Sequence, residues 1–150
     1  MNRSLLIVDD DIDQLSALTR WLSRRGYHVV TANHPRHALV AASGGQFHAA
    51  LVDASLPEID GLELMKRLKR IQNDLPVIVL SAYEFLAYKT PESWSNTASA
   101  FACLRKSCDL GLLERTIKDA IDRAIDEPPR TEQFGERRLS EVAIACPPIG

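Results

Sequence analysis

Five polar side chains that could carry metal and phosphoryl chemistry follow short apolar runs along this sequence. Asp9 and Asp10 come after the first run, and Asp53, Ser81 and Lys106 come after the third, fourth and fifth. Carboxylates held close together repel one another, and a hard cation such as Mg²⁺ relieves that repulsion. A carboxylate beside Mg²⁺ can act as a nucleophile toward phosphorus and form an aspartyl phosphate. A lysine ammonium and a serine hydroxyl could then bind the phosphoryl oxygens, so all five side chains have a role in one reaction.

The apolar runs that precede these residues have the character of buried strands. Each run is short and mostly apolar, as expected for a strand that is covered on both faces. Helical patterns separate the runs, and this alternation predicts an α/β fold with a five-stranded parallel sheet. In such a sheet, ligands lie at the carboxyl ends of the strands, where the five polar residues would meet. The predicted strands are 4–8, 27–32, 49–52, 76–80 and 101–104.

Helical spacing and end signals predict four helices, over 11–25, from 33 to 45, over 61 to about 72, and over 109 to about 126. Asn33 is the expected cap of the second, which carries Pro35 in its first turn. The segment 83–100 has no clear pattern. Proline and charge are frequent in 127–150, which we expect to be a flexible tail, or a docking segment, after a domain over 1–126. One apolar stripe marks the last helix: Leu110, Leu113, Ile117, Ile121 and Ile125.

Composition places the chain among soluble globular proteins and excludes several classes. Of 150 residues, 45% are hydrophobic and 25% charged, and 18 basic against 20 acidic residues give a net charge of -2. The basic excess that is typical of nucleic-acid binders is missing. Neither a signal-peptide pattern nor a membrane-length apolar run is present, so a cytoplasmic location is expected. Cys103, Cys108 and Cys146 lack CxxC spacing, which predicts reduced thiols rather than disulfides or a zinc site.

Four segments resemble the receiver domain of bacterial two-component response regulators. They are SLLIVDDD at 4–11, ALVDASLPEIDGLELMKRLK at 50–69, PVIVLSAY at 76–83 and SAFACLRKS at 99–107. The second is the most specific, because Asp53, Pro57, Asp60 and Gly61 all fall at the family's spacing. The resemblance runs from about residue 2 to residue 126, and it implies a five-stranded flavodoxin-like (βα)₅ sandwich.

The resemblance implies a metal-binding and phosphorylation role for the acidic residues. Asp53 matches the phosphorylated aspartate of the family, and Asp9 and Asp10 match the acidic pair that binds Mg²⁺ with it. The main-chain carbonyl of Ser55 matches the remaining protein ligand of the metal. Asp11, the third of the consecutive aspartates, is expected to cap the following helix instead.

Ser81 matches the family's switch hydroxyl and Lys106 its phosphoryl-binding lysine, but two nearby positions depart from the family. Cys103 stands where an aromatic residue is usual, so burial of a ring from this position on phosphorylation is not expected. Phe101 is expected on the same face of the strand as Cys103. Ser107 replaces the proline that usually follows the lysine through a cis bond. A cis bond costs about 2.5–4 kcal/mol without proline, which predicts a trans bond and a lysine that lies further from the phosphorylated aspartate than is usual in the family.

The resemblance implies a stand-alone phosphotransfer switch, similar to chemotaxis response regulators, and not an enzyme. A sensor histidine kinase or a histidine phosphotransfer protein would donate the phosphoryl group, and phosphorylation would change binding to a downstream effector protein. Residues 127–150 are too few for an output domain, so we do not expect direct DNA binding. Without a membrane-length apolar run, we do not expect membrane insertion either. Two alternatives remain. They are an unphosphorylated pseudo-receiver that acts as a binding scaffold and, with a poorer fit of spacing, a Mg²⁺-dependent aspartyl-phosphate phosphatase.

Overall fold

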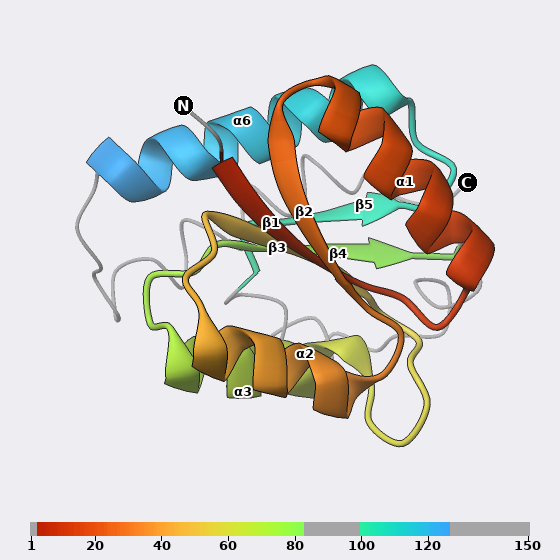
Figure 1. The fold of residues 1–150 in the computed structure, drawn as a ribbon, viewed down its shortest axis with the longest axis vertical. Coiled ribbons are helices and arrows are strands. Elements are labelled where there is room, and N and C mark those ends of the chain that lie inside the picture. The colour runs from red at the N-terminus through yellow and green to blue at the C-terminus, as the bar shows by residue number, and fades with distance from the viewer. Residues whose placement is uncertain (1–2, 83–99, 127–150) are drawn as a thin grey trace.

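Five parallel strands form the sheet that positions the candidate site (Figure 1). The computed structural model describes residues 3–82 and 100–126 of the chain. The strand order is β2-β1-β3-β4-β5, so the chain runs to one side of β1 and then returns to the other. A crevice for ligands is expected where the order reverses, between β1 and β3. The strands are β1 (Arg3–Val8), β2 (Tyr27–Ala32), β3 (Ala49–Asp53), β4 (Val77–Ser81) and β5 (Ala102–Arg105).

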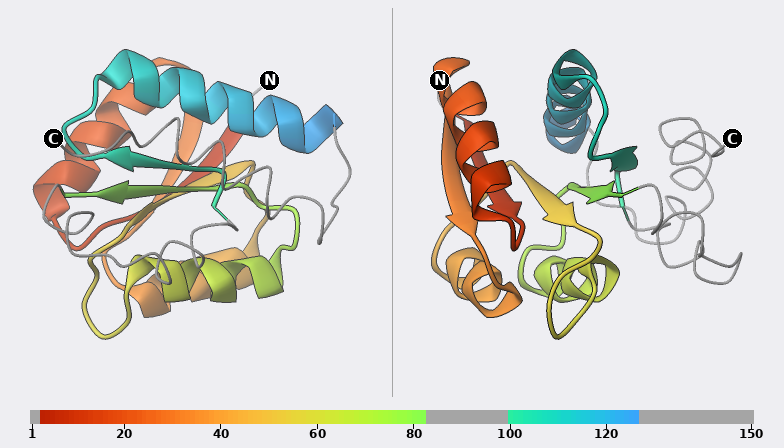
Figure 2. Two further views of the ribbon diagram at one scale, coloured as in Figure 1. Left: turned by 180° about the vertical axis from the view of Figure 1, so that it is seen from behind. Right: turned by 90° about the vertical axis from the view of Figure 1, so that its right-hand side faces the viewer.

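Helices cover both faces of the sheet. α1 (Ile12–Arg24) and α6 (Leu110–Asp126) lie on one face, and α2 (Pro35–Gly44) and α3 (Gly61–Ile71) lie on the other, as Figures 1 and 2 show. This arrangement confirms the predicted flavodoxin-like fold with a five-stranded parallel sheet. No helix within the described residues is both long and apolar enough to cross a membrane.

Alternate strand residues supply two buried clusters, one beneath each helical layer. Beneath α1 and α6 lie Leu5, Ile7, Leu51, Ile78 and Leu104, together with apolar residues of both helices. Beneath α2 and α3 lie Leu6, Val8, Val52, Val77 and Val79, with Leu64, Met65 and Leu68 of α3. Because β3 and β4 are buried on both faces and β1 is buried over most of its length, these strands are mainly apolar runs, which is why the sequence predicts their positions so closely.

Polar side chains cap α1 and α2 at their N-termini. Asp11 caps α1, as predicted, by accepting hydrogen bonds from the main-chain N–H groups of Asp13 and Gln14. The cap of α2 is His34, whose Nδ1 accepts from the N–H of Arg36. The expectation that Asn33 caps α2 is therefore wrong. The next position has the extended backbone of a cap, and an imidazole nitrogen there is a sufficient acceptor.

Two expectations about apolar side chains are also wrong. Phe101 and Cys103 lie on opposite faces, because β5 begins at Ala102 and the alternation of a strand does not extend to Phe101. The Phe101 ring packs toward α6, with the Arg123 guanidinium 5.6 Å from its centroid. Leu110 is 43% exposed because it is the first residue of α6, and the buried stripe begins at Leu113. The predictions for the Ile125 side chain, for 83–99 and for 127–150 lie outside what the structure describes.

Candidate functional site

The five candidate residues come together at the carboxyl edge of the sheet, as the sequence predicts. Asp53 is the last residue of β3, and Ser81 is the last residue of β4. Asp9 follows β1 directly, and Lys106 follows β5. The main-chain N–H of Lys106 donates to the carbonyl oxygen of Ser81 at 2.9 Å, which ties the ends of β4 and β5 together.

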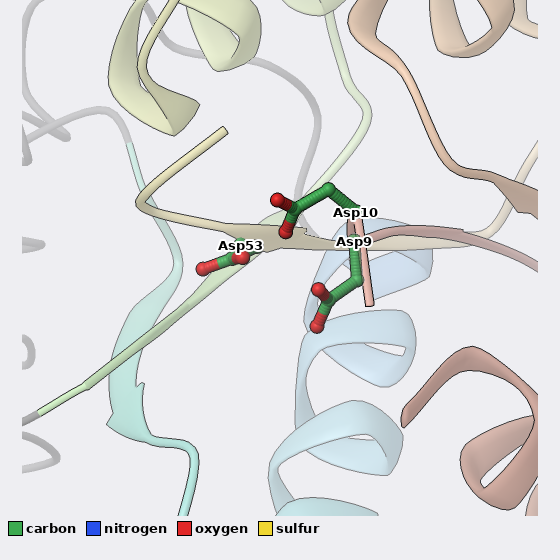
Figure 3. Close-up of side chains that lie close together, drawn as sticks. All are labelled: Asp9, Asp10 and Asp53. Atoms are coloured by element: carbon green, nitrogen blue, oxygen red, sulfur yellow. The ribbon is translucent and has the colours of Figure 1, made fainter. Parts of the chain in front are cut away.

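Three carboxylates form the acidic part of the site (Figure 3). One oxygen each from Asp9, Asp10 and Asp53 lies within 4.8 Å of the other two. Asp9 and Asp53 are only 2% and 4% exposed, whereas Asp10 is exposed. Asp11 is occupied as the cap of α1 and is not part of the cluster. A set of three carboxylates, two of them buried, is suited to a hard divalent cation, because oxygen ligands are the ones that Mg²⁺ and Ca²⁺ prefer.

The lysine ammonium lies between the two buried carboxylates. Lys106 Nζ is 3.0 Å from Asp9 Oδ2 and 3.0 Å from Asp53 Oδ2. No peptide bond among the described residues is cis, so the predicted trans bond between Lys106 and Ser107 is confirmed. After this trans bond the ammonium is in direct contact with Asp53, so the predicted displacement relative to the usual family geometry does not prevent the ion pair. The side chain of lysine is long and flexible enough to reach both carboxylates after a trans bond.

Burial and charge pairing shift the pKa values of this ion pair in the same direction. Burial raises the pKa of Asp53, and the nearby Asp9 carboxylate adds to the rise, against hydrogen bonds from Ser55 and Lys106. Burial by itself would lower the pKa of Lys106. Hydrogen bonds and Coulombic attraction to Asp53 and Asp9 outweigh burial, so the Lys106 pKa is raised. The ammonium therefore stays charged at neutral pH and offsets the negative charge of the carboxylates.

Ser81 and Ser55 contribute in different ways. The Ser81 side chain is fully buried, and its hydroxyl makes no hydrogen bond within the described part of the chain. A buried hydroxyl without a partner costs free energy, so it is a group that a ligand could satisfy. Ser55 is exposed, and its main-chain N–H donates to Asp53 Oδ1 at 3.1 Å. Sequence reasoning proposed the carbonyl of Ser55 and missed this N–H contact.

Gly61 has a structural role at the site that the motif alone does not explain. Its N–H donates to the carbonyl of Ala54 at 2.9 Å, which brings the first turn of α3 against the end of β3. A Cβ at this position would overlap the carbonyl oxygen of Asp53 and lie 2.8 Å from the Cα of Ala54. Only glycine therefore fits here without moving the backbone that carries Asp53.

The family model of the response regulator receiver domain matches residues 5–118. The chain belongs to this family. As a receiver domain, it is a two-component signalling domain. Its relatives include the transcriptional regulatory protein ZraR of Escherichia coli (strain K12), which is 31% identical over 97% of this chain and 35% of its own length. The chain thus spans about a third of the length of these curated relatives.

Solved receiver structures share the fold. A CheY-like response regulator receiver domain from Methanospirillum hungatei superposes with a TM-score of 0.76 at 26% identity, over 84% of this chain and 98% of that one. A response regulator protein from Burkholderia pseudomallei has a TM-score of 0.67 at 26% identity, over 84% of this chain and 73% of that one. The predicted family and fold are therefore confirmed.

Proposed function

We propose that this receiver domain is a phosphotransfer switch in which the Asp53 carboxylate accepts a phosphoryl group. The observation that carries the proposal is the placement of Asp53, buried at the end of β3, beside Asp9 and Asp10 and in contact with the Lys106 ammonium. An ionised Asp53 oxygen would form the new bond to phosphorus as the bond from phosphorus to the donor's nitrogen breaks. The freed donor nitrogen then takes up a proton from solvent.

The oxygen donors at the site fit a Mg²⁺ ion. Asp9, Asp10, Asp53 and the main-chain carbonyl of Ser55 would hold it, and the bound ion would offset negative charge as the phosphoryl group approaches. The structure of the Burkholderia pseudomallei response regulator is described with a phosphorylated aspartic acid and a calcium ion, which supports both an aspartyl phosphate and a bound divalent cation in a protein of this fold.

Lys106 and Ser81 would bind the transferred phosphoryl group. The Lys106 ammonium is already 3.0 Å from an oxygen of Asp53, and a charge-assisted hydrogen bond to a phosphoryl oxygen requires only a small displacement. The buried hydroxyl of Ser81 would gain the partner that it lacks within the described residues. To reach this partner, the Ser81 hydroxyl would move toward the phosphoryl group. This movement at the end of β4 is the local change that the proposed switch needs.

The proposed phosphoryl donor is a sensor histidine kinase or a histidine phosphotransfer protein in the cytoplasm. Phosphorylation would change how the domain binds a downstream effector protein. Curated relatives of this chain are transcriptional regulatory proteins in which the matching region is about a third of the length. Direct binding of this chain to DNA is not part of the proposal, since its charges are nearly balanced.

Phosphorylation by acetyl phosphate, with Mg²⁺ or with EDTA, tests this function. The wild-type protein should be labelled only with Mg²⁺. Asp10→Asn should need much more Mg²⁺ for half-maximal labelling, because it removes a metal ligand. The matched change Asp11→Asn should behave like wild type, because asparagine also caps helices well. Labelling in EDTA, or equal effects of the two substitutions, would contradict the proposed metal site. The absence of any labelling would favour the pseudo-receiver alternative.

A further inference from the structure

The loop that connects Asp53 to α3 contains a strained turn at Glu58. Glu58 has a φ of 68°, and it is the only non-glycine residue with a positive φ in the described part of the chain. The N–H of Ile59 donates to the carbonyl of Pro57 at 2.8 Å, which closes a γ-turn around Glu58. A γ-turn with a positive φ at its centre is rare and strained for a residue with a side chain. Glycine would relieve this strain, so the glutamate side chain needs a separate explanation.

The Glu58 carboxylate contacts His34, the residue that caps α2. The two side chains approach at 3.4 Å, between His34 Nε2 and Glu58 Oε1. His34 Nδ1 accepts the N–H of Arg36 at 3.1 Å, which requires an unprotonated Nδ1. The ring proton of neutral His34 therefore lies on Nε2, the nitrogen that approaches the Glu58 carboxylate. One imidazole thus joins the first turn of α2 to the tip of the loop after Asp53.

Burial does not explain why Glu58 lies there. Its side chain is 64% exposed, against 28% for His34. Within the described residues, the contact with His34 is the one interaction of the Glu58 side chain. The neighbours Leu56 and Ile59 are partly buried against the cluster beneath α2 and α3, so they attach the base of the loop. The tip is attached through Glu58.

We propose that His34 and Glu58 form a latch that positions the loop over 55–60 and with it the metal-binding edge of the site. This inference rests on the proposed function, because the loop begins at Ser55, the proposed source of a main-chain metal ligand. The loop is closed at its base by the hydrogen bond from Gly61 N–H to the Ala54 carbonyl. Its remaining freedom lies at the tip, which the latch holds against α2. His34 and Glu58 are therefore positioning residues, and neither contacts the phosphoryl group.

Two substitutions separate the latch from the other roles of these residues. Glu58→Ala removes the carboxylate but leaves a residue with a Cβ at the strained position. His34→Asn retains a good helix cap, but the shorter side chain does not reach Glu58. In the metal-free protein, both should speed hydrogen exchange of the main-chain amides between 55 and 60 while leaving the strands unchanged. This readout does not depend on Mg²⁺ or on phosphorylation.

Calorimetric Mg²⁺ titration then tests the effect on the site. Each single substitution should raise the Mg²⁺ dissociation constant about two- to fivefold, as expected for the loss of one largely exposed polar contact between a neutral imidazole and a carboxylate. The double substitution should be no worse than either single one, because both remove the same contact. Glu58→Gln should restore most of the affinity, because its amide oxygen can accept the proton on Nε2. Glu58→Gly should weaken binding despite relieving the strain.

A matched control and the wild-type protein make the outcomes decisive. In α3 and outside the loop, Glu63 forms an exposed ion pair with Arg67 at 3.3 Å. Glu63→Gln removes this ion pair, and it should change neither the hydrogen exchange of the loop nor the Mg²⁺ affinity. Unchanged exchange and affinity in Glu58→Ala and His34→Asn would overturn the latch, as would equal effects in Glu63→Gln. If the wild-type protein bound no Mg²⁺, the proposed function would fail, while the hydrogen-exchange comparison would still decide whether the latch holds the loop.

Discussion

The Cα of Gly61 lies so close to the carbonyl oxygen of Asp53 that no side chain fits between them. This contact joins the start of α3 to the residue that we propose as the phosphoryl acceptor. The backbone of Asp53 is therefore held from both sides, by β4 within the sheet and by the first turn of α3.

Substitution of Gly61 should disturb both stability and the site. Gly61→Ala forces the end of β3 away from α3, and overpacking of this kind costs about 1–3 kcal/mol of unfolding free energy. The rate of phosphorylation should fall as well, since Asp53 moves. Gly44→Ala is the matched control, because a Cβ there would meet no atom within 4 Å. Urea denaturation and acetyl phosphate labelling measure the two effects, and equal results for the two variants would argue against the close contact.

Lys106 should stabilise the metal-free protein and compete with Mg²⁺. Lys106→Met leaves the buried carboxylates of Asp9 and Asp53 without their shared cation, which should cost about 1–3 kcal/mol of unfolding free energy. Saturating Mg²⁺ should stabilise this variant more than it stabilises the wild-type protein, because the ammonium no longer occupies the space between the carboxylates. Thermal unfolding with and without Mg²⁺ measures the difference. A shift of the same size in both proteins would contradict the competition.

Ser81→Ala should separate stability from switching. Because the buried hydroxyl has no partner among the described residues, its removal should change the unfolding free energy by no more than about 0.5 kcal/mol. The response to beryllofluoride, a phosphoryl mimic, should nevertheless weaken. Hydrogen exchange between 83 and 100, the segment that follows Ser81 closely in the chain, is the measurement. A response as large as that of the wild-type protein would rule out a switching role for this hydroxyl.

The pKa of Tyr27 predicts a loss of stability at alkaline pH. Burial raises this pKa above its usual value of 10.0, and Glu114 and Asp122 add to the rise against Arg3 and Arg25. A pKa that is higher in the folded state gives stability that is complete below the unfolded pKa and is lost as pH rises through the folded one. Between about pH 9 and pH 11, the wild-type protein should therefore lose unfolding free energy more steeply than Tyr27→Phe. Parallel curves for the two proteins would contradict the assignment.

The strands and the location of the site could be predicted because each depends on local pattern and simple topology. Buried parallel strands are continuous apolar runs, and the predicted and observed strand ends differ by no more than about one residue. Once the sheet is parallel, Asp9, Asp53 and Ser81 must meet at its carboxyl edge.

Features that depend on contacts between distant segments could not be predicted. The contact of His34 with Glu58 joins two loops, and nothing local marks either residue. The sequence motif identifies Gly61, but its contact with Asp53 becomes visible only when α3 is placed against β3. The face on which Phe101 lies depends on where β5 begins, and that position is set by pairing with β4. The reach of Lys106 after a trans bond likewise depends on the separation of β5 from β1 and β3.

Intact-mass spectrometry after incubation with acetyl phosphate and Mg²⁺ tests the central claim most directly. We expect the wild-type protein to gain the mass of one phosphoryl group, and Asp53→Asn to gain none while remaining folded. Asp74→Asn, a change at an exposed aspartate between α3 and β4, should be labelled like the wild-type protein. Normal labelling of Asp53→Asn, or no gain of mass by the wild-type protein, would contradict the proposal that Asp53 is the phosphoryl acceptor.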